Sequence, residues 1–338
     1  MSLPTSEIGK TGVTVTQLGF GGAPLGELFE RVTGKQSTET LQAAWDAGIR
    51  YYDTAPFYGH GKSEHRTGHF LQDQPRADFA LSTKIGRVLT AAKGEDFTSE
   101  FWNHPLPFDF YYDYSYDGVM RSFEQSLHRL GVNRVDLLMI HDLDIWFNQK
   151  ETRITAWLNQ LFTSGWRALE ELKADGRIRG IGAGINETGM IPRFADYVDL
   201  DCAIVAMPYN LLDQETLDGE FPMCEESGVG IIVGAPFASG ILATGAKEGA
   251  YYKYAPATPG ILDRTSKIEA VCARHDVPLI AAALQFPLFH PIVNAIIPGA
   301  LTPEHVTSNA QNSVLDIPTQ VWAELKSEGL IREDSPTP

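Results

Sequence analysis

Four polar side chains lie at or just beyond the ends of short apolar stretches, a placement that suits proton transfer. Asp53 ends the stretch YYD, Lys84 ends LSTK and His141 ends LLMIH, while Tyr58 follows shortly after Asp53. An unpaired buried charge is costly, so we predict a Lys84–Asp53 ion pair. An ammonium group beside a phenol favours the phenolate, which predicts that the pKa of Tyr58 is lowered from about 10 and makes it a general acid or base. His141 is then expected to hydrogen-bond the substrate oxygen.

These residues share one edge if the strands that carry them run parallel. Short β-branched runs alternate with helical patterns along the chain, and runs such as VDLLMI (135–140) are almost continuously apolar, which is typical of parallel strands buried on both faces. The predicted strands are residues 16–20, 50–53, 79–84, 135–141, 178–183, 202–206, 230–234 and 295–298. Eight strand–helix pairs predict an α/β fold of the (β/α)8 TIM-barrel type, in which the carboxyl ends of the strands form one rim.

A doubly wound open sheet is the rival architecture, and it predicts a Gly-rich dinucleotide turn after the first strand. The stretch GFGGAP (19–24) has Pro24 where the third Gly belongs, and GAGINE (182–187) has Glu187 there. The barrel is therefore favoured. Because no Pro/Gly-rich linker divides the chain, we expect a single domain over residues 1–338, with a core over 6–330 and a frayed tail over 331–338.

Two connections after predicted strands are too long to be plain loops. Residues 86–116 hold nine aromatic side chains, and residues 142–162 include Trp146, Phe147 and Trp157. These rings either fold the insertions onto the barrel or line a flat-walled pocket for a ring-shaped ligand. For the second case, the residues expected in the substrate pocket are Phe57, Trp102, Asp142 and Trp146.

Composition restricts the partners and the compartment. The 338 residues carry a formal charge of −16, which argues against nucleic acid or an anionic membrane as the main partner, and no run of about 20 apolar residues is present. The start, MSLPTSE, has neither the basic head nor the apolar stretch of a secretory signal, and three widely spaced cysteines fit neither a disulfide framework nor a zinc ribbon. We expect a cytoplasmic enzyme with a small-molecule substrate and no metal; the sequence leaves open whether it is a monomer or a homo-oligomer.

In combination, the motifs resemble those of the aldo-keto reductase superfamily over about residues 6–330. They are DTA (53–55) with YG (58–59) and SE (63–64), TK (83–84), IH (140–141), the opening hairpin IGKTGVTV (8–15), YNLL (209–212), PFASGIL (236–242), and IPGA (297–300) leading to Asn309. The resemblance implies a (β/α)8 barrel with an N-terminal hairpin and long loops that binds NAD or NADP. It also implies a catalytic tetrad of Asp53, Tyr58, Lys84 and His141, in which Tyr58 exchanges the proton and His141 positions the carbonyl or hydroxyl.

The resemblance further implies where the cofactor is held. Asn186 matches the residue that binds the nicotinamide amide, whereas Ala206 and Gly234 stand where many members have a Gln and a stacking Tyr. The implied cofactor-binding residues are Gly21, Asn186, Tyr209, Ala235, Pro236, Phe237, Ser239, Gly240, Leu242, Pro298, Gly299, Ala300, Thr302, His305 and Asn309. NADPH-preferring relatives place Lys and Arg at the positions of Gly299 and His305, so we expect NAD to be preferred over NADP.

Within the superfamily, APFASG (235–240) and IHD (140–142) resemble bacterial NAD-dependent sugar dehydrogenases of the D-threo-aldose 1-dehydrogenase (L-fucose dehydrogenase) type and similar pyridoxal 4-dehydrogenases. The resemblance implies oxidation of an aldose such as L-fucose or D-arabinose at C1 to the lactone. One alternative is a pyridoxal 4-dehydrogenase that forms 4-pyridoxolactone. Another is a weakly active cofactor-binding protein of the regulatory β-subunit kind, because fold does not fix function.

Overall fold

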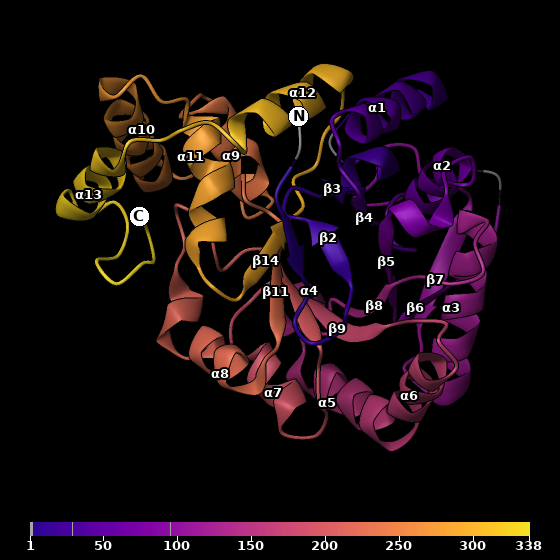
Figure 1. Cartoon of the computed structure of the whole chain (residues 1–338). Helices are drawn as coiled ribbons and strands as arrows, with labels where there is room; N and C mark the ends of the chain where they lie inside the picture. The colour runs from indigo at the N-terminus through magenta and orange to yellow at the C-terminus, as the bar shows by residue number, and fades with distance from the viewer. Residues whose placement is uncertain (1–2, 29, 95) are drawn as a thin grey trace.

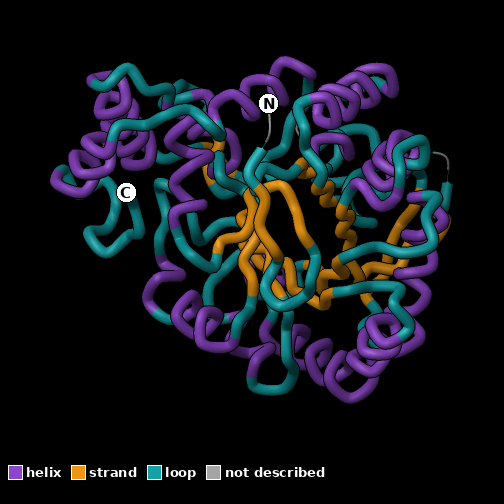
Figure 2. Tube along the Cα trace, in the orientation of Figure 1, coloured by secondary structure: helices purple, strands orange, loops and turns teal. Residues whose placement is uncertain are grey.

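The computed structural model describes residues 3–28, 30–94 and 96–338. Residues 1 and 2 belong to the stretch MSLPTSE, in which we predict no secretory signal, and they lie outside the described residues. At its centre is a parallel sheet of eight strands in the order β14-β11-β10-β9-β8-β5-β4-β3, ringed by helices (Figures 1 and 2). Parallel bridges join Leu18 to Ile296 and Gly21 to Gly299, so the two end strands meet and the sheet closes. The predicted (β/α)8 barrel is confirmed. The strands are β3 (Phe20–Gly21), β4 (Tyr51–Asp53), β5 (Ala80–Ile85), β8 (Leu137–His141), β9 (Gly180–Ile185), β10 (Cys202–Val205), β11 (Gly230–Val233) and β14 (Val293–Ile296).

The helices cover the outer face of this barrel. They are α1 (Gly34–Asp46), α2 (Lys62–Leu71), α3 (Tyr116–Leu130), α4 (Ile145–Asn148), α5 (Glu151–Gln160), α6 (Trp166–Ala174), α7 (Met190–Ala195), α8 (Glu220–Ser227), α9 (Ile241–Thr244), α10 (Pro259–Arg274), α11 (Leu279–Gln285), α12 (Pro303–Asn312) and α13 (Thr319–Ser327). Several begin at capping side chains: Ser115 accepts from the amide of Gly118, and Thr302 accepts from that of His305. Over the described residues, none of these helices has the length and apolar character needed to cross a membrane.

The alternation of side chains along the strands places the polar residues of the site. Tyr51, Leu137 and Met139 belong to the cluster inside the barrel, whereas their neighbours Tyr52 and Leu138 pack outward against helices. Side chains in a strand point to alternate faces. The inward row of β4 therefore continues from Tyr51 to Asp53, and that of β8 continues from Met139 to His141. Both polar residues take the last inward position, at the carboxyl end of the strand.

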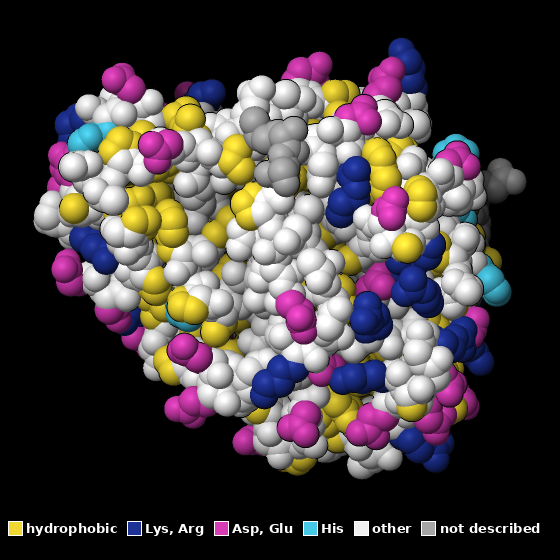
Figure 3. Space-filling view, viewed as in Figure 1, with side chains coloured by type: hydrophobic (Ala, Val, Ile, Leu, Met, Phe, Trp, Pro, Cys, Tyr) yellow, Lys and Arg dark blue, Asp and Glu magenta, His cyan; other side chains and the backbone are white. Residues whose placement is uncertain are grey.

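The opposite end of the barrel is covered by an antiparallel hairpin of β1 (Thr5–Glu7) and β2 (Thr14–Thr16), which lies in front in Figure 1. Ile8, Val13 and Val15 of the hairpin join the interior cluster. Figure 3 views this closed end, where acidic and basic side chains are interspersed on the surface. The prediction of one strand over residues 16–20 was wrong: Thr16 ends the hairpin, and the barrel strand starts at Phe20.

Both long connections contain secondary structure of their own. In the first, β6 (Arg87–Ala91) pairs antiparallel with β7 (Phe108–Tyr112); the second forms α4 and α5. The tail predicted to fray over 331–338 is instead packed. Ile331 is buried, and Arg332 donates its N–H to Gln214 Oε1 and pairs with Asp218. The apolar surface of Ile331 and these polar contacts hold the tail against the body of the protein.

Candidate active site

Lys84 and Asp53 form a buried ion pair at the carboxyl ends of neighbouring strands. Lys84 Nζ donates to Asp53 Oδ2 at 2.7 Å and to the carbonyl oxygen of Thr54 at 2.9 Å, and both charged side chains are at most 3% exposed. Ser82 Oγ donates to the other carboxylate oxygen of Asp53 at 2.7 Å. The predicted pair is confirmed, and every polar atom that it buries on the carboxylate has a partner.

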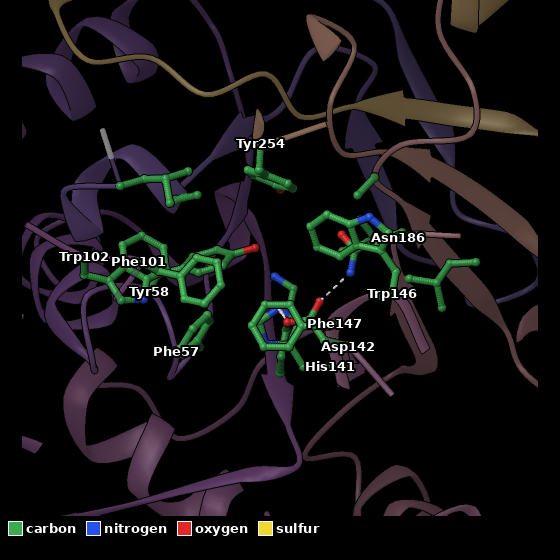
Figure 4. Close-up of a pocket in the computed structure, with 17 residues that line it drawn as sticks. Phe57, Tyr58, Phe101, Trp102, His141, Asp142, Trp146, Phe147, Asn186 and Tyr254 are labelled. Atoms are coloured by element: carbon green, nitrogen blue, oxygen red, sulfur yellow. Dashed lines mark hydrogen bonds and ion pairs between the residues drawn. The ribbon is translucent and has the colours of Figure 1, made fainter. Parts of the chain in front are cut away.

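Tyr58 is held over this pair by a loop whose backbone crosses another loop at close range. A Cβ on Gly59, which has a φ of +64°, would lie 2.6 Å from the carbonyl oxygen of Gly26. Only glycine permits this approach, so the backbone next to Tyr58 has little freedom. Lys84 Nζ lies 4.7 Å from the centre of the Tyr58 ring, and the ring of His141 lies 5.7 Å from it. Figure 4 shows Tyr58 and His141 facing one cavity.

The predicted lowering of the Tyr58 pKa was wrong. Burial raises the pKa of Tyr58 well above its ordinary value, and the negative charges of Asp53 and Asp142 raise it further, while Arg87 lowers it. The physical reason is the burial of the phenol, and the Lys84 ammonium group directs its hydrogen bonds to Asp53 and Thr54. In the protein without bound ligands, Tyr58 is therefore a phenol and a proton donor.

His141 is neutral in this environment. Burial lowers the pKa of His141 well below 6.5, and the positive charges of Arg87 and Lys84 lower it further. Its Nε2 atom lies 3.3 Å from Asp142 Oδ2. The hydroxyl of Tyr114 donates to the carbonyl oxygen of His141 at 3.2 Å and fixes the end of β8. A neutral imidazole in this position provides a hydrogen-bond donor without adding a charge to the site.

Arg87 is a member of the site that sequence reasoning missed. Its side chain is 1% exposed, and its Nη2 atom lies 3.0 Å from Asp142 Oδ2. The guanidinium carbon lies 4.3 Å from the ring centre of Phe57, 4.8 Å from that of Phe147 and 5.1 Å from that of Tyr112. The available signal was a lone arginine at the start of an insertion rich in aromatic residues, because guanidinium groups stack on aromatic faces.

A pocket lies above the tetrad, between the carboxyl ends of the strands and the aromatic side chains of the insertions. Phe57, Trp102, Asp142 and Trp146, the four residues predicted for a substrate pocket, all line it. Other aromatic side chains of the two insertions pack on each other instead, as Tyr112 does on Trp157 with ring centres 4.4 Å apart. Some of the aromatic side chains of the insertions therefore line the pocket, and others pack the insertions together.

A small hairpin of β12 (Tyr251–Tyr252) and β13 (Ala255–Pro256) adds Tyr254 to the pocket, which the sequence did not predict. The hydroxyl of Tyr252 donates to Asp213 at 2.7 Å, and the backbone N–H of Tyr254 donates to Ser239 Oγ at 3.0 Å. The Tyr254 ring lies 5.5 Å from that of Trp146. The hairpin therefore brings an aromatic ring from the connection after β11 to the edge of the pocket (Figure 4).

One wall of the pocket suits a nicotinamide ring. Gly184, Ile204 and Ala206 line it, and their small or aliphatic side chains suit contact with the face of a ring. Beside this wall, Asn186 Nδ2 donates to Asp142 at 3.0 Å and to Asp144 at 2.9 Å, which fixes the amide and leaves its oxygen as an acceptor for a carboxamide N–H. The residues present therefore fit the group at this wall.

The other residues implied for the cofactor lie in three settings. Gly21 is buried, and its N–H donates to the carbonyl oxygen of Pro298 at 3.1 Å, so it serves barrel closure. Tyr209 and Leu242 are 0% exposed, and the Tyr209 ring packs against Phe221 at 4.7 Å, so these two side chains lie in the core and their contact with the cofactor stays a prediction. The rest follow the carboxyl ends of β11 and β14: Ala235, Pro236, Phe237, Ser239, Gly240, Pro298, Gly299, Ala300, Thr302, His305 and Asn309.

Comparison with known proteins agrees with this geometry. A family model described as "Aldo/keto reductase family" matches residues 17–328. Pyridoxal 4-dehydrogenase of Microbacterium luteolum is 39% identical, covering 98% of this chain and 100% of that protein, and D-threo-aldose 1-dehydrogenase of a Pseudomonas species is 38% identical, covering 97% of each. The solved holo form of an aldo-keto reductase from Bacillus halodurans shares the fold, with a TM-score of 0.74 and 23% identity over 99% of this chain and 100% of that one. The chain therefore belongs to the aldo/keto reductase family. Its members depend on nicotinamide cofactors, which supports oxidoreductase activity for this chain.

Proposed function

We propose that the protein oxidises an aldose such as L-fucose or D-arabinose at C1 to the lactone, with NAD preferred over NADP. The observation that carries this proposal is the convergence of Asp53, Tyr58, Lys84 and His141 on one pocket that also contains a carboxylate, Asp142. The similarity to a D-threo-aldose 1-dehydrogenase over nearly the whole chain supports the same substrate class.

The site residues divide the reaction between them. A nicotinamide held beside Asn186 would supply the acceptor for the hydride of the substrate carbon. Tyr58, once deprotonated, accepts the hydroxyl proton while the electrons of the O–H bond form the C=O bond of the lactone. His141 donates a hydrogen bond to the same oxygen, and Lys84, 4.7 Å from the centre of the Tyr58 ring, offsets the negative charge of the phenolate.

The preference for NAD rests on the start of α12. Gly299 and His305 offer no permanent positive charge to a 2′-phosphate. Hydrogen bonds from its own backbone N–H and from the Thr302 hydroxyl lower the pKa of Glu304, so that its carboxylate remains negative. A negative charge at this position repels a phosphate, whereas the 2′-hydroxyl of NAD is unaffected.

Pyridoxal oxidation is the second candidate, and the aromatic walls of the pocket favour it. Phe101, Trp102, Trp146 and Phe147 line the pocket, and the aromatic faces of such side chains suit a flat ring. A pyridoxal 4-dehydrogenase is also similar over almost the whole chain. Both substrates are cyclic hemiacetals that yield lactones, so the same proton and hydride transfers apply.

One spectrophotometric experiment tests the proposal. Cofactor reduction is followed with L-fucose, D-arabinose and pyridoxal, each with NAD and with NADP, and we expect turnover of the aldoses with a lower KM for NAD. Tyr58→Phe is the control: it should remove most turnover and leave the Kd for the cofactor nearly unchanged. Turnover of pyridoxal alone would select the second candidate. Cofactor binding without turnover of any alcohol or carbonyl compound would favour the regulatory role.

A further inference from the structure

Asp142 is held in a strained position beside the catalytic histidine. Its φ is +46°, in the left-handed region that costs energy for residues other than glycine. Asn148 Nδ2 donates to its carbonyl oxygen at 2.6 Å, and its own N–H donates to the carbonyl oxygen of Gly184 at 3.0 Å. Among the described residues that line the pocket, it is the only acidic one. The fold thus maintains a costly backbone conformation that presents a carboxylate to the pocket.

Three protein groups fix this carboxylate without using its full capacity. Arg87 Nη2 lies 3.0 Å from Oδ2, His141 Nε2 lies 3.3 Å from the same oxygen, and Asn186 Nδ2 donates to Oδ1 at 3.0 Å. A carboxylate has about four acceptor positions. The side chain is 11% exposed, so one acceptor position remains toward the pocket. Figure 4 shows Asp142 beside His141, with the dashed line to Asn186.

The separation between Asp142 and His141 matches a diol better than a single hydroxyl. A substrate oxygen bound to His141 Nε2 brings the hydroxyl of the neighbouring ring carbon toward Asp142 Oδ2, because these two protein atoms are themselves 3.3 Å apart. Arg87 supplies the opposite charge that a carboxylate needs at this depth.

We propose that Asp142 accepts a hydrogen bond from the hydroxyl on the ring carbon next to the carbon that is oxidised, and thereby selects polyhydroxylated cyclic hemiacetals. This inference rests on the proposed function and narrows it. An aldose carries such a hydroxyl at C2. In the hemiacetal of pyridoxal, the neighbouring ring carbon carries none, so pyridoxal forgoes the contact.

The test compares D-arabinose with 2-deoxy-D-ribose, which differs from it only in lacking the C2 hydroxyl. We expect the wild-type protein to prefer D-arabinose in kcat/KM by about 10-fold to 100-fold, as for the loss of a hydrogen bond to a charged group. Equal kcat/KM values for the two sugars would overturn this inference and leave the proposed function intact. Turnover of neither sugar would overturn the proposed function itself. This comparison needs no variant, so it does not depend on the folding of a mutant.

Variants then assign the preference to Asp142. Asp142→Asn should reduce the preference for D-arabinose to about threefold or less, because a neutral acceptor forms a weaker bond. Asp144→Asn is the matched control: Asp144 binds the same Asn186 amide at 2.9 Å but is 0% exposed, and the wild-type preference should persist. The assays are run near pH 8, because burial and then Asp142 raise the pKa of Asp144 to about 6 and its carboxylate is ionised there. If Asp142 merely positioned His141, Asp142→Asn would slow both sugars equally and leave the preference unchanged, which would overturn the inference.

Discussion

Replacing Arg87 by methionine removes the buried positive charge that pairs with Asp142. The Arg87 side chain is 1% exposed and lies 3.0 Å from the carboxylate. Breaking a buried ion pair by removing one partner costs about 3–5 kcal/mol, because the remaining charge is left without compensation. For 338 residues the entropy of unfolding is on the order of 0.7 kcal/mol per kelvin. The expected fall in Tm is therefore about 4–7 °C.

Differential scanning calorimetry measures this shift, and Arg167→Met provides the matched control. Arg167 also pairs with a carboxylate, Glu171 at 3.6 Å, and also lies over an aromatic ring, that of Tyr116 at 4.5 Å, but its side chain is 70% exposed. We expect its loss to change Tm by less than about 1 °C, since exposed pairs contribute little. Combining Arg87→Met with Asp142→Asn should recover more than half of the loss, because no charge is then stranded. Equal Tm values for the two single variants would refute the reasoning from burial.

Three further predictions concern other parts of the molecule. Oxidation needs the Tyr58 phenolate, and because burial raises the pKa of Tyr58, the phenolate becomes more populated as pH rises. The kcat/KM for oxidation should therefore increase from about pH 6 to about pH 10, while the kcat/KM for reduction stays level. A kcat/KM for oxidation that falls with pH would contradict this. Gly68→Ala should destabilise the protein by about 1–3 kcal/mol in urea unfolding, because the new Cβ would lie 2.4 Å from the carbonyl oxygen of Leu130, and a gain in stability would show that the helices separate freely. Tyr252→Phe removes the hydrogen bond to Asp213 and should speed hydrogen exchange of the 251–255 amides by about tenfold or more; unchanged exchange would mean that other contacts hold the hairpin.

The barrel and its tetrad could be predicted from sequence because both follow from short-range patterns. Continuous apolar runs marked the parallel strands, and Asp53, Lys84 and His141 stood at the ends of those runs. The first strand could not be placed correctly, because TVTQLGFG (14–21) reads as one run. In the structure Leu18 meets Ile296 through an isolated bridge, a contact between distant parts of the chain that no local pattern contains.

The features of the site that could not be predicted depend on where side chains point in the folded protein. Burial of the Tyr58 ring, which no local pattern reveals, raises its pKa, while the hydrogen bonds of Lys84 Nζ go to Asp53 and Thr54. Arg87 begins an aromatic insertion whose spacing does not reveal which rings surround it. Tyr254 reaches the pocket from a two-residue turn in which Lys253 and Tyr254 both have positive φ values, far beyond the end of β11.

Closure of the cylinder links the beginning of the polypeptide to its last third. All four tetrad residues lie within the first 141 positions. The barrel that positions them closes where the N–H of Gly19 donates to the carbonyl oxygen of Ile296, at 2.8 Å. During synthesis on the ribosome, these four residues therefore emerge long before the strand that closes the barrel. The site can form only when the final barrel strand docks. A fragment that ends before this strand contains the four residues but not the fold that brings them together.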